Sequence, residues 1–288
     1  LLLLLGHIQL RFGAYESAES LLEEANAIAI THLPKSDSTR LKARTHWATI
    51  LMRYRYQNEK ARDILATAIQ DYRQAGGSDD ENLVEALTEL GVAHQELDKF
   101  EQSIEIQRDA LLTARQVYGN LHAAVESAMN SLGVALSWGG ASHWKESELV
   151  LRETLQLSRA LYGEKNANHA RVLTSLSDVL AMQDKNLEAE RLAQKAVTIY
   201  EQIFTEPNTN IAFALNALGN AQYRLNKLDE AEAAHQRVLE IDRYLTGPES
   251  IDAGVSLGNL ANIASKRRNY QREEQLSREQ LAIFRKNL

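Results

Sequence analysis

The stretch LNALGNAQYRLNKLDEAEAAH, residues 215–235, contains a Leu-Gly pair and, twelve residues after the glycine, the alanine Ala231. The position of Ala231 has counterparts along the whole chain: Ala18, Ala61, Ser103, Ser147, Ala189, Ala231 and Glu273. The successive intervals are 43, 42, 44, 42, 42 and 42 residues. A period this regular predicts stacked copies of one supersecondary unit.

The Leu-Gly pair of this stretch also recurs, mostly thirteen residues before the matching position. Its leucine is found at Leu5, Leu90, Leu176, Leu218 and Leu260, followed by the small residues Gly6, Gly91, Ser177, Gly219 and Ala261. The fourth copy has the pair Leu132-Gly133 fifteen residues ahead of Ser147. Glycine inside a helix costs about 1 kcal/mol relative to alanine, so it needs a reason. We therefore expect Gly219 to be a close contact between two helices, and not a hinge or a phosphate-binding loop.

The positions of the prolines and of the candidate helix caps predict an all-α chain. The three prolines of this 288-residue sequence, Pro34, Pro207 and Pro248, all lie between copies, as expected if the copies are helical. Candidate N-caps stand at Ser78 and Asp79, at Asn208 to Asn210 and at Ser250. We expect one array over 1–288 with repeats at about 1–30, 40–73, 82–117, 124–161, 168–203, 210–245 and 251–286.

Charge and motifs argue against several classes of function. The net charge is −7 with interspersed signs, which predicts no nucleic-acid partner, and the absence of cysteine excludes disulfides and thiol catalysis. Five opening leucines are far short of the roughly 20 apolar residues of a membrane span, so no membrane insertion is expected. Leu5-Gly6 already stands in register and no Met precedes it, which indicates a piece of a longer chain and leaves the compartment open.

No sequence motif indicates catalysis. The eight histidines form no HExxH motif and no i, i+4 pair, and no nucleophile elbow, Walker loop or kinase signature is present. We expect no catalytic residue, no metal site and no cofactor. His235 occupies a position of the repeat that is usually large and packed, so it is predicted to be a core histidine.

Several copies resemble the tetratricopeptide repeat family. The match is carried by LNALGNAQYRLNKLDEAEAAHQRVLEID (215–242), LTELGVAHQELDKFEQSIEIQRDAL (87–111) and LTSLSDVLAMQDKNLEAERLAQKAV (173–197). The 42-residue period and the junction SRALYGEKNANHARV (158–172) are similar to the kinesin-light-chain-like subgroup. The second copy lacks Leu-Gly, and the last has Glu273 where the family has alanine. The resemblance implies a right-handed superhelix of about seven helix-turn-helix repeats, with the first helix of each pair lining the inside.

The same resemblance implies a peptide-binding groove on the first helices. Asn216, Asn220 and Arg224 are four residues apart and share one helical stripe, with Phe213 and Tyr223 beside it. In the family these positions contact extended peptides. The corresponding groove positions of other copies are Arg171, Thr174, Asp178, Met182, Asn262, Ser265, Lys266, Asn130, Trp138, His46, Arg53 and Tyr54.

These residues favour a non-catalytic module that binds a protein or peptide. The cations Arg171, Arg224 and Lys266 favour a ligand with acidic residues. Two alternatives stay open: a regulatory region of a larger signalling enzyme, such as a bacterial serine/threonine kinase, and a self-association module. The longer turn at 137–145 is interpreted as a surface insertion in which Trp144 takes the aromatic packing position and Trp138 is a candidate anchor.

Overall fold

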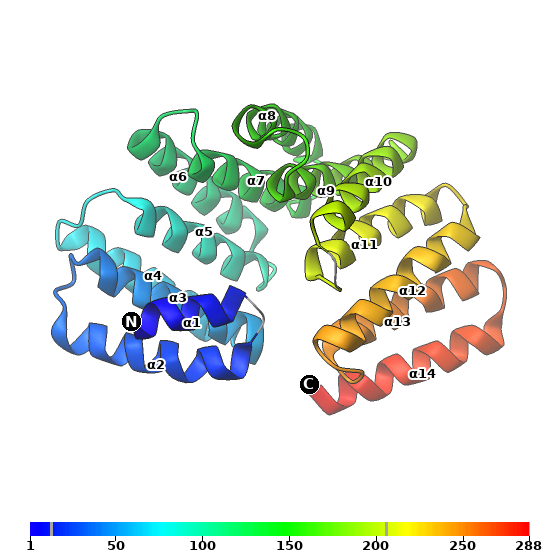
Figure 1. The fold of residues 1–288 in the computed structure, drawn as a ribbon, viewed down its shortest axis with the longest axis horizontal. Coiled ribbons are helices and arrows are strands. Elements are labelled where there is room, and N and C mark those ends of the chain that lie inside the picture. Colours follow the sequence, from blue (N-terminus) through cyan, green and yellow to red (C-terminus); the bar gives the residue numbers. More distant parts are fainter. Residues whose placement is uncertain (12–13, 205–206, 288) are drawn as a thin grey trace. The chain divides into compact units, whose positions relative to one another are not determined.

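The computed structural model describes residues 1–11, 14–204 and 207–287, and within them the chain forms fourteen α-helices and no strand (Figure 1). The predicted all-α fold is therefore confirmed. The helices are α1 (Leu2–Arg11), α2 (Tyr15–His32), α3 (Ser38–Arg55), α4 (Asn58–Gln74), α5 (Glu81–Gln95), α6 (Phe100–Tyr118), α7 (Ala123–Trp138), α8 (Trp144–Tyr162), α9 (Ala167–Met182), α10 (Asn186–Ile203), α11 (Thr209–Arg224), α12 (Leu228–Leu245), α13 (Ile251–Lys266) and α14 (Tyr270–Asn287).

The odd-numbered helices are called here first helices and the even-numbered ones second helices. A first helix forms a hairpin with the second helix that follows it in the pairs α1–α2, α3–α4, α5–α6, α9–α10, α11–α12 and α13–α14. The contacts divide the chain into two compact units, residues 1–150 and 151–288, with the boundary inside α8. The organisation of the whole chain as one continuous array stays a prediction. None of the helices described is both long and apolar enough to cross a membrane.

Most first helices begin with a side-chain cap. Asn208 accepts a hydrogen bond from the backbone N–H of Asn210, and Ser250 accepts one from Ala253, as predicted. Before α5 the cap is Asp80, which accepts from the N–H of Leu83, and not Ser78 or Asp79. Asp80 is the N-cap because it directly precedes the first helical residue, Glu81.

The turns inside the hairpins share a left-handed residue at one position of the repeat. These residues are Tyr56, Asp98, Gly140, Asp184, Asn226 and Arg268, with φ between 53° and 94°. After Asn226, the N–H of Lys227 donates to the carbonyl of Gln222 five residues earlier, a bond that closes the C-terminus of α11. The 42-residue period thus extends to backbone conformation.

The hairpins are held by close packing at small residues. Ala231 is fully buried, and a Cβ atom added to Gly219 would lie 2.7 Å from Nε2 of His235 on α12. His235 itself is only 2 % exposed. The expectations of a helix contact at Gly219 and a core histidine at position 235 are both confirmed.

Ion pairs join the second helices of neighbouring hairpins at a fixed separation in sequence. The pairs Arg73–Asp109 (2.9 Å), Arg152–Glu188 (3.0 Å), Arg237–Glu201 (2.6 Å) and Arg243–Glu279 (2.6 Å) are each separated by 36 residues. Because these side chains are partly exposed to solvent, each pair contributes at most about 1 kcal/mol. The same separation recurs in both units, so these ion pairs follow the repeat.

Candidate functional site

The first helices of the second unit carry a line of polar side chains, Asp178, Asn220 and Asn262, which we call the polar ladder. Its members lie 42 residues apart on α9, α11 and α13. Asn262 is exposed, while Asp178 and Asn220 are half-buried. None of the three makes a side-chain hydrogen bond within the described part of the chain, so their polar groups remain available to a ligand.

The protonation of Asp178 suits it to the same role as the two asparagines. Burial raises the pKa of this carboxyl to about 7. Near neutral pH the group is therefore partly protonated and can both donate and accept a hydrogen bond. A carboxamide does the same, which makes all three members of the polar ladder suitable partners for a peptide unit.

Other predicted residues are engaged with their neighbours. Asn216 accepts a hydrogen bond of 3.1 Å from Nδ2 of Asn259 on α13. The ammonium of Lys266 donates a hydrogen bond of 2.7 Å to the backbone carbonyl of Tyr223. It also lies 4.1 Å from the centroid of the Tyr223 ring. The residue pattern did not indicate Asn259, because the position 42 residues after Asn216 is Gly258.

Apolar side chains stand on the same helices. Phe213 on α11 is 62 % exposed and Val255 on α13 is 49 % exposed, and the two lie 42 residues apart. Isolated exposed apolar residues need no explanation, but two at the same position of adjacent repeats, on helices that also carry the polar ladder, form a mixed surface.

The predicted cations Arg224 and Arg171 differ in solvent exposure and in the residues that they interact with. Arg224 pairs with Asp184 at 3.6 Å, and the two side chains are 45 % and 85 % exposed. Arg171 is half-buried; burial raises the pKa of Tyr200 to about 12, and the charge of Arg171 acts against that rise. Arg171 therefore lies close enough to α10 to interact with a buried phenol.

Two predicted site residues belong to α7 of the first unit. Asn130 is buried, with an Oδ1 atom that accepts no hydrogen bond from the described residues. Trp138 is exposed and stacks on Phe100, with ring centroids 6.4 Å apart. Trp144 is half-buried, and its indole N–H donates to the carbonyl of Ser137. The ligand-binding roles of Asn130 and Trp138 stay predictions.

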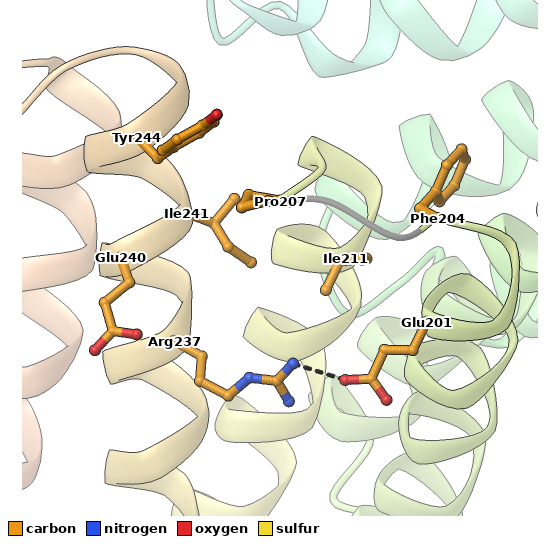
Figure 2. Close-up of a pocket in the computed structure, with 8 residues that line it drawn as sticks. All are labelled: Glu201, Phe204, Pro207, Ile211, Arg237, Glu240, Ile241 and Tyr244. Carbon is orange, nitrogen blue, oxygen red and sulfur yellow. Dashed lines mark hydrogen bonds and ion pairs between the residues drawn. The ribbon is translucent and has the colours of Figure 1, made fainter.

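A pocket of about 550 Å³ lies on the second helices of the second unit, between α10, α12 and the start of α11 (Figure 2). An ion pair between Arg237 and Glu201 crosses it at 2.6 Å. The rest of its lining is formed by Glu240 and the largely apolar side chains of Phe204, Pro207, Ile211, Ile241 and Tyr244. The sequence did not predict this pocket, because its residues come from three elements and share no period.

Comparison with known proteins places these features in context. Tetratricopeptide repeat models match residues 83–124, 140–202 and 207–286. No curated protein sequence matches the chain. The structure is similar to that of a Rap protein complexed with competence and sporulation factor, with a TM-score of 0.73 and 14 % identity, over 99 % of this chain and 77 % of that one.

Two further solved structures show the same fold. The apo form of the quorum sensor NprR from B. thuringiensis has a TM-score of 0.63 and 12 % identity, over 98 % of this chain and 86 % of that one. BtubC (BKLC) from P. vanneervenii has a TM-score of 0.62 and 19 % identity, over 79 % of this chain and 91 % of that one.

Proposed function

Because this chain belongs to the tetratricopeptide repeat family, we propose that it is a non-catalytic scaffold that binds an extended peptide segment on the first helices of its second unit. The observation that carries the proposal is the polar ladder, whose three side chains make no hydrogen bond to another residue that the structure describes. Phe213 and Val255 stand on the same helices and supply apolar contact surface. The complex of the similar Rap protein with a factor supports a binding role for the fold.

The chemistry of the surface favours a particular mode of recognition. Asn220 and Asn262 can each accept from a peptide N–H and donate to a peptide carbonyl, which fixes an extended backbone without demanding a sequence. Arg171, Arg224 and Lys266 add positive charge on the same three helices. The preferred ligand is therefore an extended peptide that carries acidic residues.

Selection from a library of random peptides displayed on phage tests the proposal. The groove variant is Phe213→Ala, Asn220→Ala, Asn262→Ala, which removes one apolar and two amide side chains without breaking a described hydrogen bond. The matched control is Leu187→Ala, Gln194→Ala, Gln202→Ala, which removes the same kinds of group from exposed positions of α10.

We expect selected peptides to be enriched in Asp and Glu, to bind the groove variant at least tenfold more weakly than the wild type, and to bind the control variant equally well. Failure to select any peptide, or equal losses in the two variants, would overturn the proposed site. Selection of peptides without acidic residues would overturn only the charge preference. Circular dichroism establishes that both variants keep their helicity.

The two alternative functions stay predictions. A regulatory role within a signalling enzyme such as a serine/threonine kinase is tested by reading the gene on both sides of the present sequence. Self-association is tested by measuring the molar mass at increasing protein concentration. Neither alternative requires the polar ladder, so the groove variant separates both from peptide binding.

A further inference from the structure

Three first helices of the first unit bring together two imidazoles and a carboxylate. His7 lies on α1, His46 on α3 and Glu85 on α5, and each offers one ligand atom such that all three atoms lie within 4.8 Å of one another. In sequence they are 39 residues apart, and they lie 11, 15 and 18 residues before Ala18, Ala61 and Ser103. From one copy to the next, the residue lies three or four positions nearer the N-terminus of its helix. That is about one helical turn, so all three residues stay on the same helix face.

His46 contacts both of the other members of this cluster. Nε2 of His46 lies 3.1 Å from Oε1 of Glu85. The rings of His7 and His46 are stacked, with centroids 4.5 Å apart and an angle of 24° between their planes. The His46 side chain is only 2 % exposed, and its Nδ1 atom is buried without a hydrogen bond within the described residues.

The charge of Glu85 also suits a cation. Burial alone would raise the pKa of this carboxyl, but a hydrogen bond from His46 and the charges of His46, Lys42 and His7 outweigh it and lower the pKa. Glu85 is therefore ionised at neutral pH. Its side chain is 37 % exposed, which leaves the cluster open to solvent on the side of α5.

We infer that His7, His46 and Glu85 form a binding site for a Zn²⁺ ion. Two imidazole nitrogens and one carboxylate oxygen are a donor set that zinc uses when a fourth position is left to water or another ligand. Zinc–ligand distances of about 2.0–2.2 Å in a tetrahedron place the ligand atoms about 3.3 Å apart. The His46–Glu85 pair already has this separation, and side-chain rotation of His7 and the half-exposed Glu85 brings the third atom into range.

The positive charge of Lys42 acts against the ion. Zinc binds the neutral imidazole and the ionised carboxylate, so protons compete with the metal. The bound ion would join α1, α3 and α5, and hence three consecutive hairpins of the first unit. This site does not depend on the peptide-binding face, which lies in the other unit.

Titration of untagged, EDTA-treated protein with Co²⁺ tests the assignment, because tetrahedral Co²⁺ absorbs visible light strongly. We expect one equivalent of Co²⁺ to produce this absorption and one equivalent of Zn²⁺ to abolish it. His7→Asn and Glu85→Gln are each expected to weaken binding at least tenfold. The control is His143→Asn: His143 pairs with Glu101 at 3.2 Å in the same way but has no third ligand among the described residues.

A second measurement keeps the inference testable if a variant fails to fold. The melting temperature of the wild-type protein is expected to rise with Zn²⁺ and not with Mg²⁺. The assignment is wrong if the wild type shows no saturable binding of Co²⁺ or Zn²⁺. It is equally wrong if His143→Asn abolishes the absorption while His7→Asn and Glu85→Gln leave it unchanged.

Discussion

Gly219 on α11 faces the ring of His235 on α12 at a distance that leaves no room for a methyl group. Alanine would gain about 1 kcal/mol of helix propensity, but displacing a buried ring costs about 1–3 kcal/mol. We expect Gly219→Ala to lower the free energy of unfolding by about 1 kcal/mol, as measured by urea denaturation followed by circular dichroism.

Gly258 provides the matched control for that substitution. A Cβ atom there would meet Nε2 of Gln280, the far end of a flexible and only half-buried side chain. Gly258→Ala is therefore expected to be neutral or slightly stabilising. If Gly219→Ala proves as stable as Gly258→Ala, the contact with His235 does not explain the glycine.

His235 also makes stability depend on pH. Burial lowers its pKa to about 4, against about 6.5 in an unfolded chain. Between these values the unfolded state binds more protons, so stability is full above pH 6.5 and is lost as the pH falls toward 4. At pH 4.5 the loss is about 2–3 kcal/mol. Leu22, Leu65 and Leu151 occupy the equivalent position, so His235→Leu is expected to remove this loss.

The measurement compares melting temperatures at pH 7 and pH 4.5 for wild type and His235→Leu. Asp178, with its pKa raised to about 7, acts in the opposite direction, because stability increases as the folded state takes up its proton. That effect is present in both proteins and cancels in the difference between them. A decrease of equal size in both proteins would contradict the prediction for His235.

At the level of helices, the ion pairs between second helices are expected to contribute little energy. Arg243 and Glu279 are 38 % and 45 % exposed. A double-mutant cycle with Arg243→Ala and Glu279→Ala should give a coupling of about 0.2–1 kcal/mol that weakens in high salt. The exposed pair Arg278–Glu274 within α14 is the comparison, with an expected coupling of about 0.3–0.5 kcal/mol. A salt-independent coupling well above these values would show that packing, and not charge, links α12 to α14.

The turns between paired helices offer a stabilising change. Arg268 has φ of 60°, a conformation that costs a non-glycine residue about 1 kcal/mol or more. Arg268→Gly is expected to raise the free energy of unfolding by up to about 1 kcal/mol. Ala282→Gly, at an exposed position inside α14, is expected to lower it by about 1 kcal/mol. Thermal unfolding of the two variants measures these changes in stability. A loss of stability in both variants would contradict the assignment of strain to the turn.

At the level of the whole molecule, the repeat made the hairpins predictable, because each copy packs mainly against its neighbours and so repeats the same residue types. Gly219, His235, Asn208 and Ser250 were identified on this basis. Asn259, the pocket at Arg237, and the cluster of His7, His46 and Glu85 were not. They depend on the stagger between successive helices, which shifts the contacting residues by one position or one turn, so their intervals in the sequence differ from the 42-residue period.

The same local packing predicts that part of the chain folds by itself. A protein of residues 144–288, which begins with α8, retains three complete hairpins in addition to α8 and is expected to be helical and to unfold cooperatively. Circular dichroism during thermal unfolding measures this. A broad, non-cooperative loss of helicity would mean that the second unit requires the residues before α8.

The left-handed residue in the hairpin turns has a consequence for how such a gene can change. From Tyr56 to Asp98, from Asp98 to Gly140, from Asp184 to Asn226 and from Asn226 to Arg268 the interval is 42 residues. Recombination between two of these turns would therefore delete or duplicate a whole hairpin and rejoin the chain at the same backbone conformation. Copy number can vary by such exchanges without a new turn having to evolve, whereas crossovers elsewhere in the coding sequence would have to occur in matching phase to leave a foldable product.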